Sequence, residues 1–437
     1  MNANSNQTTG AFGNPWMQLL IGVICMACVA NLQYGWTLFV TPIDDKYHWG
    51  RAAIQVAFTL FVLVETWLIP VEGYLVDRFG PRPVVIAGAF LVAIAWALNS
   101  VAASLPVLYI AAAIGGIGTG CVYGTCVGNA LKWFPGRRGL AAGITAAGFG
   151  AGAAITIGPI AAMIKSSGYQ QAFLVFGLIQ GAIVFVMAWA LQVAPPSLLA
   201  AKAKPNQTAH GYTPAEVLRS PCFWVMYVMF VLVAAGGLTM AASMSPIAKD
   251  FKIDKEAVEL LGVVWGTVGV VAIQLNRILD GIGRPFFGWL SDQIGREYTM
   301  ALAFAIGAGA LFLLSQVGTA PSAFVLITGI YFGVYGEIFS LFPATQGDTF
   351  GAKFAAANAG MLYTAKGAGA LLVPFAAAIA KANGWNSVFL IAMGFNLVAA
   401  VLALVALKPL RARHFAMSKA AYAPAAASPG VGDHRTT

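Results

Sequence analysis

The sequence predicts an all-α polytopic membrane protein with twelve transmembrane helices in two halves of six. Of its 437 residues 59% are hydrophobic and only 9% are charged, and its mean hydropathy is +0.77. Apolar runs of about 18 residues or more recur along the chain, and each is long enough to cross a hydrocarbon layer about 30 Å thick. These runs are rich in Ala and Leu and alternate only weakly, which argues against a transmembrane β-barrel. Helices are the remaining way to satisfy the backbone inside a bilayer.

The N-terminal half is expected over residues 16–194, after a polar tail over residues 1–15. Its six spans are 16–41, 52–76, 83–103, 107–131, 139–164 and 170–194. The C-terminal half is expected over residues 221–408. Its six spans are 221–247, 258–290, 298–316, 322–344, 355–380 and 386–408. We expect the tail over 409–437, which is rich in Ala, Pro and Ser, to be disordered.

A longer connection over residues 195–220 separates the two halves. It is rich in Pro, Ala and Lys, and it ends in the start signal of a helix, with Thr213 as the N-cap, Pro214 in the first position and Glu216 in the third. The side chains of Thr213 and Glu216 can each accept a hydrogen bond from the other residue's backbone N–H, which defines a capping box. We interpret this connection as the hinge between the halves.

The basic residues indicate how the chain is oriented in the membrane. Short loops on the side of the two termini carry ten Lys and Arg residues, loops on the opposite side carry seven, and the C-terminal tail adds five more. By the positive-inside rule, both termini and the 195–220 loop are cytoplasmic in a bacterial inner membrane. The net charge of +9 is therefore a topology signal, and we expect no nucleic-acid partner. No Lys or Arg precedes Lys46, so the first apolar run is a retained span rather than a cleaved signal peptide.

The two halves repeat one another. The second span ends in a G-x-x-x-D-x-x-G pattern that starts at Gly73, and the eighth span ends in the same pattern from Gly288, at an offset of 215 residues. Two copies at half-chain spacing indicate a parallel repeat of six spans, which is typical of the major facilitator fold. Charged residues in and after these motifs are predicted gate residues, which brace the halves on the cytoplasmic side: Asp77, Arg78, Arg82, Asp292 and Arg296.

Two cations inside predicted spans stand out against this repeat. Arg284 lies in the eighth span, about 12 Å along the helix from the surface residue Asp292, and thus near the midplane. Lys366 interrupts the eleventh span. The repeat pairs these positions with Ile69 and Ala151, so both cations belong to the C-terminal half alone. Cations at this depth are costly and usually face a partner or a ligand, so we predict that Arg284 and Lys366 bind an anion.

Four further charged residues could change the charge of that site. We expect Arg277 and Asp280 to form a local pair that positions Arg284, although Asp280 could instead pair with Arg284 one turn later. Glu337 in the tenth span and Glu65 in the second are candidates for a proton site or for tuning the charge. With neither ionised, the site carries two positive charges, which suits a dicarboxylate. An ionised Glu337 would leave one, which suits a monocarboxylate or proton coupling.

Several motifs resemble the oxalate:formate antiporter family of the major facilitator superfamily. They are Asn31-Leu-Gln-Tyr-Gly-Trp-Thr-Leu-Phe-Val, Trp133-Phe-Pro-Gly-Arg-Arg-Gly, Arg284-Pro-Phe-Phe-Gly, Ser340-Leu-Phe-Pro and Ala365-Lys366. The resemblance implies that Arg284 and Lys366 bind the substrate carboxylates. It also implies further pocket residues, most of them aromatic: Gln33, Tyr34, Tyr123, Tyr335, Phe339 and Tyr363. The stretch from Trp133 to Gly148 resembles monocarboxylate transporters as well.

We therefore expect a secondary transporter that exchanges small carboxylates, namely oxalate for formate, by alternating access. Repulsion between the two cations in the empty site is expected to keep an unloaded carrier from crossing, which makes exchange obligatory. A proton-coupled monocarboxylate symporter is the nearest alternative. A membrane sensor that binds carboxylates without transporting them is an alternative of another class.

We expect no enzymatic activity, cofactor or metal site. The predicted spans contain no nucleophile–base pair or cluster of metal ligands, and all four histidines lie outside them. The five cysteines lie in or beside apolar runs, where we expect small buried hydrophobic residues rather than disulfides. The expected partners are small carboxylate anions and the lipid bilayer, and we expect the carrier to function as a monomer.

Overall fold

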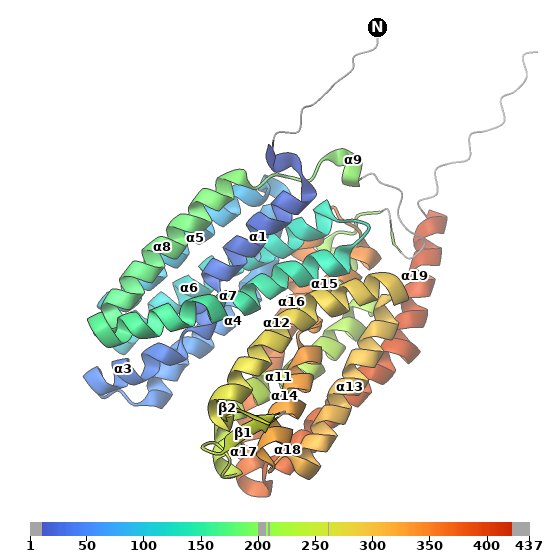
Figure 1. The fold of residues 1–437 in the computed structure, drawn as a ribbon. Helices are drawn as coiled ribbons and strands as arrows, with labels where there is room; N and C mark the ends of the chain where they lie inside the picture. Colours follow the sequence, from blue (N-terminus) through green and yellow to red (C-terminus); the bar gives the residue numbers. More distant parts are fainter. Residues whose placement is uncertain (1–10, 200–206, 209, 261, 422–437) are drawn as a thin grey trace, which may run out of the picture.

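The computed structural model describes residues 11–199, 207–208, 210–260 and 262–421, and its helices form two bundles side by side (Figure 1). The N-terminal bundle contains η1 (Ala11–Gly13), α1 (Pro15–Val29), α2 (Asn31–Tyr34), α3 (Thr37–Tyr47), α4 (Arg51–Phe79), α5 (Pro81–Val101), α6 (Leu105–Trp133), α7 (Arg138–Ser167) and α8 (Tyr169–Ala190). The connection between the bundles contains α9 (Pro196–Leu199) and α10 (Pro214–Leu218).

The C-terminal bundle follows the same plan and confirms the predicted fold class. It contains α11 (Pro221–Asp250), β1 (Ala257–Leu260), β2 (Val263–Thr267), α12 (Val268–Ile294), α13 (Arg296–Val317), α14 (Pro321–Tyr335), α15 (Ile338–Phe350), α16 (Ala355–Ala370), α17 (Val373–Asn383), α18 (Trp385–Leu402), a π-helical turn (Ala403–Leu407) and α19 (Lys408–Ala421).

The two bundles contact each other more closely at one end than at the other. The start of α1, α9 and α19 mark what we call the terminal end, and α3 and the β1–β2 hairpin mark the opposite hairpin end (Figure 1). The ribbons of the bundles approach each other at the terminal end and diverge toward the hairpin end. Two helix pairs form most of the interface, α7 on α12 and α4 on α16. The repeat relates these two pairs, so the interface has the approximate symmetry that a parallel repeat predicts.

Small residues allow this close contact. A Cβ atom added to Gly288 in α12 would collide with the carbonyl oxygen of Gly139 in α7, and one added to Gly139 would collide with that of Gly288. At the related contact, a Cβ atom on Gly73 would lie 2.5 Å from the carbonyl oxygen of Ala356. Glycines at helix interfaces inside membranes bring two backbones together in this way. The first residue of each repeated motif is therefore a contact point between the halves.

The eighth span begins later than predicted. Residues 257–260 and 263–267 form the two strands of an antiparallel hairpin, and α12 starts only at Val268. The expectation of a helix from residue 258 was wrong because the segment is rich in β-branched residues, which favour strands over helices. Gly262 and Gly266 also adopt positive φ angles of 74° and 133°, which a helix does not permit.

Two other local predictions have different outcomes. The capping box is confirmed, because Glu216 N–H donates to the Thr213 hydroxyl and Thr213 N–H donates to the Glu216 carboxylate. The expected disorder of the C-terminal tail is wrong for residues 409–421, which belong to α19 (Lys408–Ala421). Arg411 fixes this helix by donating to the Thr349 hydroxyl at 2.8 Å and to the Glu297 carboxylate. The remainder of the tail lies outside the described residues.

Eleven helical segments of the described chain are long and apolar enough to cross a membrane. α12 is not among them, although its 27 residues exceed the roughly 20 that a span needs. It carries Arg277, Asp280 and Arg284 in its interior, which lowers its hydropathy. Because α12 packs between α7 and α14, we assign it as the twelfth span. Its charges are thus placed at the interface between the bundles rather than toward lipid.

Candidate substrate site

Arg284 lies inside α12 with only 1% of its surface exposed. Its Nη2 donates to Asp280 Oδ2 at 2.6 Å, and its Nη1 donates across the interface to the carbonyl oxygen of Ala146 in α7 at 2.9 Å. Its Nε has no hydrogen-bond partner among the described residues. The guanidinium therefore joins the two bundles, and its Nε–H can still donate to a further acceptor.

The expected pair between Arg277 and Asp280 is not formed. Asp280 pairs with Arg284, and the guanidinium carbon of Arg277 instead lies 4.6 Å from the centre of the Tyr34 ring, a cation–π contact between the bundles. Burial explains why Asp280 pairs with Arg284 rather than with Arg277, because Arg277 is partly exposed whereas Arg284 and Asp280 are both buried. A buried cation without a counter-ion is far more costly than an exposed one.

Lys366 is likewise buried, with 2% of its surface exposed. Its Nζ donates to the Tyr363 hydroxyl at 3.1 Å and lies 3.5 Å from Glu65 Oε2. Glu65 belongs to α4 in the N-terminal half and is fully buried. The sequence shows no acidic residue near Lys366, so this partner comes from the packing of α4 on α16. Both cations thus have a carboxylate nearby, and the expectation that unrelieved repulsion governs the empty site was wrong.

Phe339 at the start of α15 connects the two cations. Its ring centre lies 4.6 Å from the guanidinium carbon of Arg284 and 5.9 Å from Lys366 Nζ. The helix break at Gly336 makes this possible, since a Cβ atom at Gly336 would lie 2.7 Å from the carbonyl oxygen of Asp280. The break brings the α14–α15 backbone against α12 and places one aromatic ring in contact with both cations.

A chain of aromatic rings crosses from one bundle to the other beside these cations. Tyr34 and Tyr123 each pack edge-on against Phe149, with ring centres 5.4 and 5.3 Å apart. Tyr123 also contacts Tyr363 of the other half at 4.7 Å. Tyr363 and Tyr335 both contact Phe339, at 6.1 and 5.9 Å. The aromatic residues that were predicted therefore form one cluster, together with Phe149, which was not predicted.

Several polar groups in this region lack a hydrogen-bond partner within the described chain. They include the hydroxyls of Tyr123 and Tyr335 and the side-chain oxygen of Gln33. The Glu337 carboxylate is also fully buried and has neither a hydrogen-bond nor an ion-pair partner among the described residues. Buried polar groups are normally paired, so unpaired ones mark a place for a ligand, a water molecule or a proton.

Two of the predicted gate residues, Asp77 and Asp292, join the halves at the terminal end. Asp292 accepts hydrogen bonds from Gly139 N–H and Leu140 N–H in the first turn of α7, at 3.1 and 2.9 Å. Asp77 accepts from the first turn of α16 in the same way, at 3.4 Å from Ala356 N–H and 2.9 Å from Ala357 N–H. Each repeated motif therefore places its aspartate at the positive end of a helix in the opposite half.

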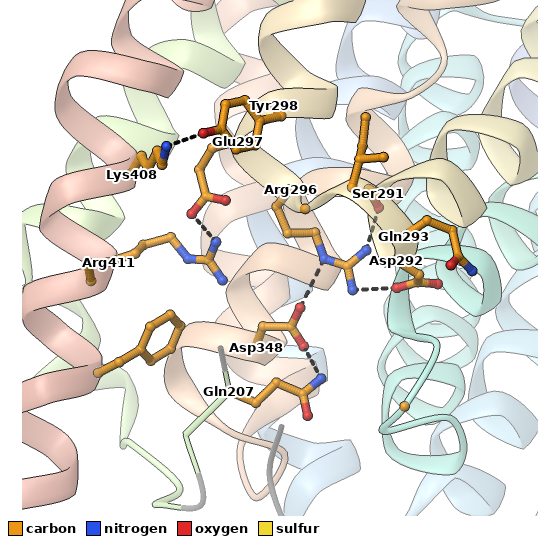
Figure 2. A pocket seen from close by; sticks show the side chains of 15 residues that line it. Gln207, Ser291, Asp292, Gln293, Arg296, Glu297, Tyr298, Asp348, Lys408 and Arg411 are labelled. Atoms are coloured by element: carbon orange, nitrogen blue, oxygen red, sulfur yellow. Dashed lines mark hydrogen bonds and ion pairs between the residues drawn. The ribbon is translucent and has the colours of Figure 1, made fainter. Parts of the chain in front are cut away.

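Figure 2 shows how cations reinforce these contacts beside a cavity of about 410 Å³ that charged side chains help to line. Arg296 contacts both Asp292 at 2.6 Å and Asp348 of α15 at 2.9 Å. Asp348 also accepts from Arg138 of the opposite half at 2.9 Å, and from Gln207 of the connection at 2.8 Å. The charges in this cavity are thus paired with one another, which fits a brace rather than a substrate site.

Not every predicted gate residue joins the halves. Arg82 donates to the carbonyl oxygen of Leu191 at 3.4 Å, and Arg78 stacks on its neighbour Phe79, so both stay within the N-terminal half. Lys132 provides the cation for Asp77, at 2.6 Å. The sequence reasoning missed Lys132, Arg138 and Asp348. Arg138 lies within the motif that starts at Trp133, whereas the only signal for Asp348 is an acidic residue shortly after a predicted span.

Comparison with known proteins identifies the family. A model described as Major Facilitator Superfamily matches residues 19–374 and 275–429. The chain belongs to this superfamily. It is 34% identical over 404 residues to the oxalate:formate antiporter of Oxalobacter formigenes, covering 92% of this chain and 94% of that protein. This similarity confirms the family that the sequence motifs indicated.

More distant similarities agree with this assignment. Monocarboxylate transporter 13 of Bos taurus is 23% identical over 338 residues, covering 76% of this chain and 75% of that protein. The crystal structure of the transporter FucP in the outward conformation covers 88% of this chain and 97% of FucP, with a TM-score of 0.64 and 16% identity. The latter shows the fold alone. The chain is thus a multi-pass membrane transporter of the major facilitator type, and monocarboxylate transporters are more distant relatives than the antiporter.

Proposed function

We propose that this transporter exchanges oxalate for formate across a bacterial inner membrane, with Arg284 and Lys366 binding the substrate carboxylates. One observation carries the proposal: two buried cations from α12 and α16 lie against the same aromatic ring, Phe339. A planar dicarboxylate between them would place one carboxylate toward each cation. The activity of the antiporter relative, which is 34% identical over most of the chain, supports oxalate and formate as the substrates.

Donors for such an anion are available in the cluster. Arg284 can keep Asp280 on Nη2 and Ala146 on Nη1 while its Nε turns to a substrate carboxylate. The hydroxyls of Tyr123 and Tyr335 have no partner in the described chain and supply further donors. Charge-assisted hydrogen bonds from a guanidinium are about twice as strong as neutral ones. The aromatic faces would enclose the flat anion between rings rather than in water.

The gate supplies the conformational part of the mechanism. We propose that the terminal end is cytoplasmic, in accord with the excess of Lys and Arg in its loops. The structure is then closed toward the cytoplasm by Asp77, Asp292 and the Asp348 cluster, and its bundles diverge on the outer side. Inward opening requires the separation of Gly139 from Gly288 and of Asp77 from α16. Substrate binding at the cations would favour this rearrangement only by as much as the substrate binds the inward-open state more tightly than the closed state.

A proton-coupled monocarboxylate symporter is the second candidate. It is favoured by the two carboxylates beside the cations, Asp280 at 2.6 Å from Arg284 and Glu65 at 3.5 Å from Lys366. If both are ionised, they offset the two cations and leave little charge for a dianion. Protonation of Asp280 and Glu65 would restore the positive charge of the site.

Counter-transport in proteoliposomes tests the proposal. Purified protein is reconstituted with internal formate, internal oxalate or no substrate, and uptake of labelled oxalate is followed. We expect uptake only with internal substrate and its loss in Arg284→Gln and Lys366→Gln. Lys381→Gln serves as the matched control, because it removes an exposed lysine from α17 without touching the cluster. Uptake into empty liposomes driven by a pH gradient would favour the symporter. Transport of lactate or pyruvate instead of oxalate would keep the cation site but refute the substrate.

A further inference from the structure

We propose that Arg277 and Tyr34 form an outer gate, which closes the substrate site toward the hairpin end and admits carboxylates. The proposal rests on the proposed function, because it takes the aromatic cluster as the substrate site and the hairpin end as the outer side. Arg277 lies on α12 and Tyr34 on α2 of the opposite half. Since Arg277 does not pair with Asp280, its contact with Tyr34 needs an explanation of its own.

The substrate site is closed toward the hairpin end, although the bundles diverge in that direction (Figure 1). Arg284 and Lys366 have only 1% and 2% of their surfaces exposed, so neither end of the carrier gives solvent a path to them. At the terminal end, the contacts of the two repeated motifs account for the closure. Another contact must close the site on the opposite side.

Packing of α7 on α12 does not provide this closure, because it ends just beyond Arg284. A Cβ atom added to Gly150 in α7 would lie 3.6 Å from the guanidinium carbon of Arg284, so the two helices are still in contact at this level. Ala146 and Gly150 are both buried, whereas Ala154, one turn further along the same face, is exposed. The helices therefore separate directly above the buried arginine.

Arg277 lies where this packing stops. It precedes Arg284 by two turns of α12, which places it about 10 Å nearer the hairpin end and on the same face of the helix. Its guanidinium carbon lies 4.6 Å from the ring centre of Tyr34. Tyr34 in turn packs on Phe149 and so belongs to the aromatic cluster. The stacked pair thus connects the two halves on the outer side of the cluster.

The backbone beside Tyr34 allows the gate to move. α2, which ends in Tyr34, is only four residues long and is followed by Gly35. Beyond it, Leu38 N–H donates to the carbonyl oxygen of Gly35, three residues back rather than four. A helix bends most readily where its regular hydrogen bonds are interrupted. Bending at this interruption can separate Tyr34 from Arg277 without a movement of the whole bundle.

Arg277 also gives the gate its preference for anions. It forms no ion pair or hydrogen bond with any described residue, whereas Arg284 and Lys366 each have a carboxylate nearby. A cation–π contact uses the face of the guanidinium, and the N–H groups in its plane remain able to donate to a carboxylate. Arg277 can therefore hold an entering carboxylate before it reaches Arg284. The negative charge of that carboxylate offsets the attraction between Arg277 and the ring, which favours the open gate.

Labelling of a cysteine below the gate tests the proposal. Gly150→Cys in a full-length, cysteine-free chain places a thiol beside Arg284, and its labelling by membrane-impermeant methanethiosulfonates is followed in right-side-out and inside-out vesicles without substrate. We expect Arg277→Gln and Tyr34→Leu each to raise the rate in right-side-out vesicles by about 5- to 30-fold, the effect of one cation–π contact. Neither should raise it in inside-out vesicles. The double variant should label no faster than either single variant, because both remove the same contact.

Conservative variants distinguish a gate from a general loosening of the structure. Arg277→Lys keeps a cation over the ring and Tyr34→Phe keeps the ring, so both should label close to the wild-type rate. Lys255→Gln is the matched control, because it removes an exposed lysine beside the hairpin and should change nothing. In the wild type an anionic reagent should label faster than a cationic one, and this ratio should fall about 10-fold in Arg277→Gln.

Three outcomes would overturn the proposal. They are unchanged labelling in both Arg277→Gln and Tyr34→Leu, faster labelling in inside-out vesicles, and increases of equal size in the two conservative variants. Failure of the proposed function is distinguishable, because labelling requires no transport. A carrier that did not exchange oxalate for formate in proteoliposomes would still show the gate by its labelling rates.

Discussion

Gly288→Ala should open the terminal end of the transporter. The added methyl group would point at the carbonyl oxygen of Gly139, at a separation that real Cβ atoms do not adopt. Because backbone rather than a flexible side chain opposes it, α12 and α7 must move apart. Overpacking of this kind costs about 1–3 kcal/mol. At 1.4 kcal/mol per factor of ten, the closed state should lose population roughly 5- to 150-fold relative to the open state.

Gly281→Ala is a matched control on the same helix. Its Cβ atom would meet nothing within 4 Å, so the substitution changes helix propensity but not the interface. Spin labels at Phe79 and Ile294, which are 59% and 47% exposed at the terminal ends of α4 and α12, would report the separation of the halves by double electron–electron resonance in a cysteine-free background. We expect a longer distance to gain population in Gly288→Ala only. Identical distributions in the two variants and the wild type would refute the reasoning.

Three further variants test other parts of the structure. Tyr363→Phe removes the hydroxyl that accepts from Lys366 at 3.1 Å, and the loss of a hydrogen bond to a charged group, about 1.5–3 kcal/mol, should raise KM for oxalate roughly 10- to 150-fold. Asp348→Asn leaves two buried arginines without their shared carboxylate, so the free energy of unfolding should fall by about 3–5 kcal/mol and the melting temperature with it. Hydrogen bonds from the backbone N–H and the hydroxyl of Thr213 lower the pKa of Glu216. Thr213→Ala should therefore raise this pKa in an NMR titration.

The first two variants have matched controls, and each of the three predictions has an outcome that would contradict it. Tyr74→Phe on α4 and Asp45→Asn on α3 remove exposed groups of the same kinds and should leave KM and the melting temperature unchanged. Effects of equal size in these controls would contradict the first two predictions. Because the folded state lowers the pKa of Glu216, its stabilising contribution is present above its ordinary pKa of about 4.3 and is lost as the pH falls through the lowered value. A capping contribution that increased on acidification would contradict the third.

Patterns with a strong physical basis were predictable from the sequence. Hydropathy located the spans because a bilayer admits few backbone structures, and the repeat at an offset of 215 residues showed the two halves. Arg284 and Lys366 could be selected because a cation inside an apolar span has few structural uses. The capping box at Thr213 was predictable because it depends only on residues three positions apart.

Contacts between the halves were beyond the sequence. Nothing near Lys366 in the chain points to Glu65, some 300 residues earlier, and only the packing of α4 on α16 brings them to 3.5 Å. The choice of Asp280 between Arg277 and Arg284 depends on which arginine is buried, and helical spacing permits both pairs. The hairpin before α12 was missed because a valine-rich apolar run fits a strand or a helix equally well by hydropathy.

The most direct test of the two-cation site is calorimetric titration of the purified transporter with oxalate. We predict one binding site per chain in the wild type and in Lys381→Gln, and loss of measurable binding in both Arg284→Gln and Lys366→Gln, since either change removes a buried charge from the site. Oxalate binding with unchanged affinity in those two variants, verified as folded by their melting temperatures, would contradict the account.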